Sequence, residues 1–125
     1  MPKFRTDPKW KDIRRHRRST QPYKIKVKKD GIAEDITGWT IYFTVKENMN
    51  DDDTESGGGE AKIAKDITIH TDPTNGQTLI TLSSSDTNLT PGNYYYDIKY
   101  KDDEDNIAVL FRGRIKIIKP VTTRT

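Results

Sequence analysis

The sequence predicts an all-β protein: an immunoglobulin-like antiparallel β-sandwich of six to seven strands, preceded by an extended basic N-terminal arm. Isoleucine outnumbers leucine by 14 to 4 and threonine contributes 16 of the 125 residues, whereas alanine and leucine together number 8. Residues branched at Cβ suit the pleated surface of a sheet better than they suit a helix. Apolar residues also alternate with polar ones along several segments, which is typical of strands that bury one face.

Six segments show this alternation and define the expected strands. In chain order they span residues 23–28, 39–46, 62–69, 78–82, 94–101 and 107–118. A seventh strand is expected if residues 34–36 pair with a neighbour. Turn residues separate the segments, and Asn75-Gly76 indicates a hairpin connection between the third and fourth strands.

The same period of two assigns the faces of the strands. The side chains expected to face the core are Tyr23, Ile25, Val27, Trp39, Ile41, Phe43, Val45, Ile63, Ile67, Ile69, Ile80, Leu82, Tyr94, Tyr96, Ile98, Tyr100, Val109, Phe111, Ile115 and Ile117. Tyr42 and Tyr95 fall on the opposite faces of their strands. Because aromatic residues are enriched in the cores of protein interfaces, both are candidate interface residues. The alternative is that the domain's own loops cover them.

Charge divides the chain into an arm and a domain. Residues 1–20 contain eight lysines and arginines against Asp7 and Asp12, which gives +6, whereas the remaining 105 residues sum to −3. We therefore expect a basic arm over residues 1–20, a sandwich over residues 21–120 and a short tail over residues 121–125.

The arm carries the candidate partner-binding residues. Along it, aromatic side chains are interleaved with cationic ones. These residues are Phe4, Arg5, Trp10, Arg14, Arg15, Arg17 and Arg18. One interpretation is docking onto an acidic or mixed protein surface, with the aromatic residues as anchors. A second is contact with nucleic acid through the phosphates, and a third is an ordinary solvated tail.

Catalysis and metal binding find little support in the sequence. The chain has no cysteine, and His16 and His70 lie in no nucleophile motif. The acidic run from Asp51 does not match a calcium-binding loop, because Ser56 and Lys62 stand where glycine and glutamate are required. We expect no enzyme, no cofactor and no resident metal. No segment approaches the roughly 20 apolar residues of a membrane span, so no membrane partner is expected.

Several blocks along the chain, in order and spacing, resemble the N-terminal domain of the upper baseplate proteins of tailed bacteriophages. The blocks are residues 35–39, 65–69, 72–76, 86–98 and 113–117, and the resemblance runs from about residue 18 to residue 119. In that family the domain is a small β-sandwich that attaches receptor-binding or fibre components to the baseplate or virion body. The resemblance therefore implies a structural role.

The expected function is that of a virion structural protein of a tailed bacteriophage, assembled in the host cytoplasm. It would act as an adaptor that docks tail, baseplate or fibre components to the particle, as part of a symmetric multi-subunit assembly. A capsid decoration protein is the alternative placement. A nucleic-acid-binding protein that acts through the arm is the alternative from another class, and is not favoured.

Overall fold

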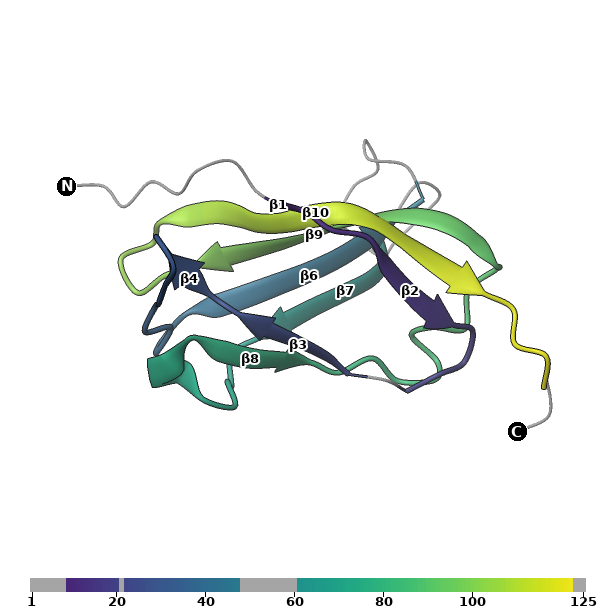
Figure 1. Ribbon diagram of the computed structural model, residues 1–125, viewed down its shortest axis with the longest axis horizontal. Coiled ribbons are helices and arrows are strands. Elements are labelled where there is room, and N and C mark those ends of the chain that lie inside the picture. The colour runs from purple at the N-terminus through teal and green to yellow at the C-terminus, as the bar shows by residue number, and fades with distance from the viewer. Residues whose placement is uncertain (1–8, 21, 48–60, 123–125) are drawn as a thin grey trace.

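The computed structural model describes residues 9–20, 22–47 and 61–122, which form a β-sandwich (Figure 1). Its strands are β1 (Lys9–Trp10), β2 (Ile13–His16), β3 (Tyr23–Lys26), β4 (Lys28–Lys29), β5 (Ile32–Ala33), β6 (Thr40–Lys46), β7 (Ala61–Ile67), β8 (Gln77–Ile80), β9 (Gly92–Lys101) and β10 (Ile107–Ile118). A single 3-10 turn, η1 (Pro73–Asn75), precedes β8. The predicted all-β class is confirmed.

The larger sheet has the order β1-β10-β9-β6-β7, and β2 also pairs with β10. The smaller sheet consists of β3 and β8, and β4 and β5 form a separate hairpin. Strands β6, β9 and β10 thus lie side by side like strands C, F and G of an immunoglobulin-like sandwich, opposite a pair that corresponds to B and E. This is the predicted architecture, with three differences. Strands β1 and β2 run parallel to β10, the hairpin of β4 and β5 is additional, and residues 34–36, the conditional seventh strand, belong to no strand.

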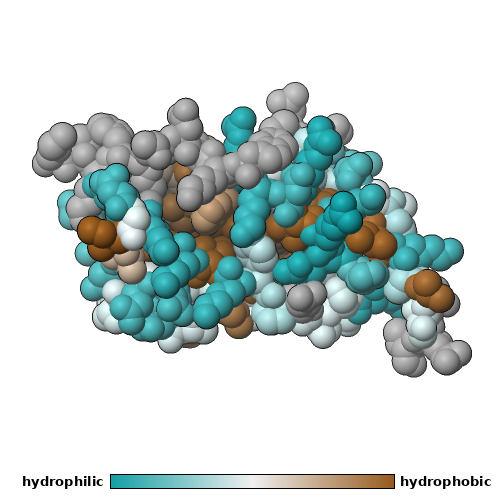
Figure 2. Space-filling model, viewed as in Figure 1, coloured by the Kyte–Doolittle hydropathy of each residue, from teal (hydrophilic) through white to brown (hydrophobic). Residues whose placement is uncertain are grey.

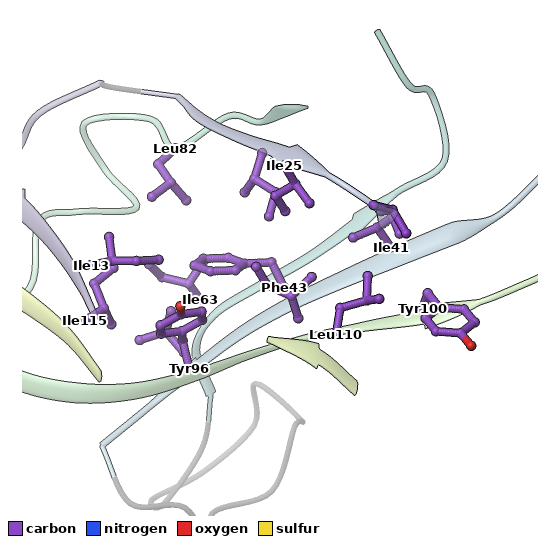
Figure 3. Close-up of a cluster of buried hydrophobic side chains, with 14 of the residues drawn as sticks. Ile13, Ile25, Ile41, Phe43, Ile63, Leu82, Tyr96, Tyr100, Leu110 and Ile115 are labelled. Atoms are coloured by element: carbon purple, nitrogen blue, oxygen red, sulfur yellow. The ribbon is translucent and has the colours of Figure 1, made fainter. Parts of the chain in front are cut away.

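The core fills the space between the sheets, where the alternation of β6 and β9 points their apolar side chains. Phe43, Ile41 and Ile98 are fully buried. Figure 2 shows hydrophobic side chains along the middle of the molecule, partly covered by hydrophilic ones. The Trp39 ring stacks on Tyr100 with ring centroids 4.5 Å apart, and Phe43 packs 5.9 Å from Tyr96. Figure 3 shows Phe43 and Tyr96 at the centre of this cluster, between the two sheets. Most of the predicted inward-facing residues are therefore confirmed.

The start of β9 is fixed by a hydrogen bond from a tyrosine to the preceding loop. The Tyr94 hydroxyl donates to the carbonyl oxygen of Thr90 at 2.6 Å. A tyrosine near the start of strand F that bonds to backbone a few residues upstream is a recurrent feature of immunoglobulin-like sandwiches. Burial raises the pKa of Tyr94, so the hydroxyl remains a donor at neutral pH.

Replacing Tyr94 with phenylalanine is expected to lower the free energy of unfolding by about 1 kcal/mol, the usual worth of one such hydrogen bond. The ring stays in place, so only the link to Thr90 is removed. Urea unfolding of the two proteins measures the change. Equal urea midpoints and equal slopes for the two proteins would contradict this prediction.

Three details of the predicted strands are corrected. Ile69 is 87% exposed, because β7 ends at Ile67 and residue 69 has left the sheet. The register of β10 shifts between Val109 and Phe111, so that Leu110 is buried in place of Val109. The segment that contains Asn75-Gly76 is no hairpin between neighbouring strands, because β7 pairs with β6 and β8 pairs with β3. It carries the chain from one sheet to the other.

Lys65 is a charged residue at a position of β7 that faces the core. Its side chain forms an ion pair with a residue outside the larger sheet. Its Nζ lies 2.8 Å from a carboxylate oxygen of Asp86, in the loop that follows β8. Burial tends to raise the pKa of Asp86, but the hydrogen bonds from Lys65 and Ser83 outweigh it and lower the pKa overall. The pair ties the edge strand of the larger sheet to the loop that crosses the end of the sandwich.

The segment expected to be an arm enters the sheet. Ile13–His16 pair in parallel with residues 115–118 of β10, and the Ile13 side chain is only 4% exposed. The physical reason is that Ile13 completes the core beside Ile115, while its charged neighbours remain at the surface. The described part of residues 1–20 is thus an edge strand of the sandwich, and the boundary expected at residue 20 does not separate it from the core.

Candidate interaction surface

The N-terminal segment is seated by a contact at Gly113. Between β1 and β2 the carbonyl oxygen of Lys11 turns toward Gly113 and accepts a hydrogen bond from the Tyr96 hydroxyl. A Cβ atom on residue 113 would overlap this oxygen and approach the Lys11 carbonyl carbon to 2.8 Å. Burial and the nearby Tyr23 raise the pKa of Tyr96, which keeps its hydroxyl protonated as a donor. Gly113 and Tyr96 together form a socket for the segment.

The same segment also contacts the smaller sheet and the loop after β8. The Arg15 guanidinium and the Lys11 ammonium lie 5.5 and 5.9 Å from the centre of the Tyr23 ring, within cation–π range. The buried Thr87 hydroxyl donates to the carbonyl oxygen of Ser19 at 2.7 Å. Arg17 donates through Nε to Asn88 Oδ1 at 3.1 Å. The segment therefore closes the edge between β10 and β3 (Figure 1).

The outward face of the larger sheet is strongly basic. Alternation and register place eight cations of the described residues on it: Arg14, Lys46, Lys62, Lys99, Lys101, Arg112, Arg114 and Lys116. Asp66 and Asp97 are the outward acidic residues of the described strands. Neighbouring segments add carboxylates: Glu47 lies 3.7 Å from the Lys62 ammonium, Asp105 lies 3.5 Å from that of Lys101, and Asp12 accepts a hydrogen bond from the Arg114 amide. We call the set of eight cations the basic face. Interface residues of this kind attract an anionic partner from a distance.

Two tyrosines interrupt the cations. Tyr95 lies between Arg114 of β10 and Lys46 of β6, and Tyr42 lies between Lys99 of β9 and Asp66 of β7. Both side chains are half-buried. A hollow of about 130 Å³ opens beside Tyr95 and is lined in part by Lys46 and Arg112.

Like charges meet at the seam between β2 and β10. Arg14 is directly opposite Lys116, and both side chains are exposed. Arg114 lies two residues before Lys116 on the same face of β10, and the Asp12 carboxylate accepts a hydrogen bond from the Arg114 backbone amide at 3.3 Å. Like charges directly opposite one another on neighbouring strands destabilise a sheet. We call Arg14, Arg114 and Lys116 the basic seam.

Replacing Lys116 with glutamate is expected to raise the free energy of unfolding by about 0.5 kcal/mol, because it converts a repulsive cross-strand pair with Arg14 into an attractive one. The gain should shrink in 1 M NaCl, where charges at the surface are screened. Thermal unfolding at low and high salt checks both statements. If Lys116→Glu is less stable than the unaltered chain at low salt, repulsion between Arg14 and Lys116 does not destabilise the sheet.

The structure brings only some of the predicted site residues together. Phe4 and Arg5 lie outside the described residues, and Trp10 is described only through its backbone, which pairs with Arg112. Arg14 belongs to the basic face, whereas the Arg15 guanidinium lies over Tyr23. Arg17 and Arg18 contact the loop at residues 87–88.

Tyr42 and Tyr95 share the outward face, on adjacent strands. Their registers differ by four residues, which separates them by about 13 Å along the sheet. They therefore form no single aromatic cluster, and their role as interface residues stays a prediction. Arg112, Arg114 and Lys116 were missed as candidates, although their alternation with Phe111, Gly113 and Ile115 was visible in the sequence.

The two histidines have different environments. His70 Nε2 donates to the carbonyl oxygen of Trp39 at 2.8 Å, and Nδ1 lies within hydrogen-bonding distance of the Thr78 hydroxyl at 2.9 Å. Both ring nitrogens of His70 thus link chain segments. His16 is exposed at the end of β2. In the described ranges, no three histidine or acidic side chains gather as metal ligands.

No helix among the described residues is long and apolar enough to cross a membrane. No protein-family model matches the sequence, and no curated protein matches it. Among solved structures, the chain is similar to the N-terminal domain of phage TP901-1 ORF48, with a TM-score of 0.56 and 10% sequence identity. The likeness covers 91% of this chain and 92% of that one. At this identity it shows a shared fold.

Proposed function

We propose that this chain is a non-enzymatic structural module of a tailed-phage virion. In this proposal it acts as an adaptor that docks tail, baseplate or fibre components to the particle through its N-terminal segment and the basic face. The observation that carries the proposal is the end-to-end likeness of the fold to a domain of a phage protein. The blocks of sequence that resemble upper baseplate proteins point the same way.

The surface supports docking. A sheet face with eight cations and two half-buried tyrosines offers charge for steering and aromatic area for contact. His70, the more enclosed histidine, already uses both ring nitrogens to join the sheets, which favours a structural role for it.

The test is lysine cross-linking and mass spectrometry of gradient-purified particles of a phage that encodes this chain. Lys99 and Lys116 report on the basic face, and Lys24 and Lys26 of β3 are the matched controls on the opposite sheet. We expect cross-links from the first pair to a tail, baseplate or fibre subunit, with fewer from the second pair.

Cross-links to the major capsid subunit would instead place the chain as a decoration protein. Absence of the chain from purified particles would overturn the virion proposal. Nucleic-acid binding would then be the next function to test, because the basic face also suits phosphates.

A further inference from the structure

The described charges are distributed unevenly along the long axis of the sandwich. The turn between β9 and β10 carries Asp102, Asp103, Glu104 and Asp105, which we call the acidic tip. The basic seam lies toward the other end of β10, where β2 is added to the sheet. Figure 1 shows the turn and the C-terminal end of β10 at opposite ends of the molecule.

The acidic tip is a fixed turn. Asp102 Oδ1 accepts hydrogen bonds from the backbone amides of Glu104 and Asn106, at 2.9 and 2.8 Å. Its Oδ2 accepts from the Asn106 side chain at 3.0 Å, and Asp105 lies 3.5 Å from the Lys101 ammonium. Asp103 and Glu104 are exposed at the apex of this turn. Their carboxylates are therefore presented at low cost in conformational entropy.

The basic seam, by contrast, has an excess of positive charge that carboxylates could neutralise. Arg14 faces Lys116 across the β2–β10 pair, with Arg114 on the same face. The Asp12 carboxylate, which accepts a hydrogen bond from the Arg114 amide at 3.3 Å, offsets only part of this positive charge. Carboxylates placed over these side chains would relieve the repulsion and hold β2 against β10. A bound anion would thus stabilise the docked N-terminal segment by linkage.

The tip and the seam of one molecule cannot neutralise each other. Arg114, the seam residue nearest the tip, lies seven residues beyond the start of β10 at Ile107, which separates the two by about 23 Å. Interactions between exposed charges are largely screened beyond about 8 Å at physiological ionic strength. A second copy of the chain, however, offers an acidic tip to the seam and a seam to the tip.

We infer that the basic seam binds the acidic tip of a second copy of this chain, in a head-to-tail contact. This inference rests on the proposed function, since it names the partner of part of the basic face. Such a contact joins two different patches, so it builds either a closed ring or an open row of subunits. Both are forms of symmetric assembly.

The experiment is a charge swap in the full chain, read by sedimentation equilibrium at 50 mM and 500 mM NaCl. The seam variant is Arg114→Glu/Lys116→Glu, and the tip variant is Asp103→Lys/Glu104→Lys. A third protein combines all four substitutions and keeps the net charge of +3. Lys24→Glu/Lys26→Glu on β3 is the matched control for the seam variant. Circular dichroism confirms that each variant is folded.

We expect the unaltered chain to self-associate at 50 mM NaCl and to dissociate at 500 mM. Each of the seam and tip variants should weaken association about tenfold or more, and the combined variant should restore it. The β3 control should change it less than about threefold.

A monomer at every concentration, or a combined variant as weak as the single ones, would overturn the inference. So would loss of association in Asp51→Asn/Asp52→Asn/Asp53→Asn without loss in the tip variant, because another acidic segment would then be the occupant. Binding of a labelled 20-nucleotide DNA that the seam variant abolishes, without self-association, would assign the seam to nucleic acid. Each of these results is independent of the cross-linking of purified particles, so that experiment tests the proposed function separately.

Discussion

Replacing Gly113 with alanine is expected to lower the free energy of unfolding by about 3 kcal/mol. The new methyl group would overlap the Lys11 carbonyl oxygen, which is backbone and has no rotamer to escape into. The segment would have to leave its socket. Loss of the buried Ile13 side chain accounts for about 1.5–3 kcal/mol and loss of the Tyr96 hydrogen bond for about 1 kcal/mol.

The sign of this change is diagnostic. In an ordinary strand, alanine is more stable than glycine by roughly 0.5–1 kcal/mol. Urea unfolding gives the stability, and hydrogen exchange shows where the structure opens. In Gly113→Ala the amides of Lys11 and Arg17, which donate to Arg112 and Ile118 of β10, should lose protection. Unchanged or higher stability with both amides protected would mean that the segment does not occupy this socket.

Replacing His70 with alanine is expected to cost about 2–3 kcal/mol. The imidazole joins the entry of β6, at Trp39, to the buried Thr78 of β8, and so connects the two sheets. Thr78 is fully buried, and without the imidazole its hydroxyl loses this hydrogen-bond partner, which by itself costs about 1–3 kcal/mol. The vacated volume beside Trp39 adds to the loss.

His16 provides the matched control, since it is the other histidine of the chain and is exposed. His16→Ala is expected to change stability by less than about 0.5 kcal/mol. Thermal and urea unfolding of the two variants side by side make the comparison. Equal effects would indicate that His70 does not bridge the sheets.

The strands that could be predicted are those whose own residues specify one buried face. The segments from Trp39 to Lys46 and from Tyr94 to Lys101 alternate without interruption, and both were found where expected. Their faces were also correct, because a shift of one residue would expose the whole apolar set.

What the sequence did not reveal depends on partners far along the chain. Ile13 is a lone apolar residue among charges, so it produces no periodicity, and its strand exists only because β10 offers an edge. The bulge at Leu110 likewise depends on pairing with β9. The candidate surface was predicted in part: alternation placed Tyr42 and Tyr95 outward, but it could not show which cations of other strands would surround them.

The first described strands of this chain are neighbours of the last. Residues 13–16 find their place only against residues 115–118, about a hundred positions later. On the ribosome, the N-terminal segment emerges early and must wait until the final strand is synthesised. Contacts of such long separation are also slow to form, because a large loop must close first. Completion of this fold therefore comes only after β10 is synthesised, and until then the edge of β10 and the basic segment are both open to other molecules.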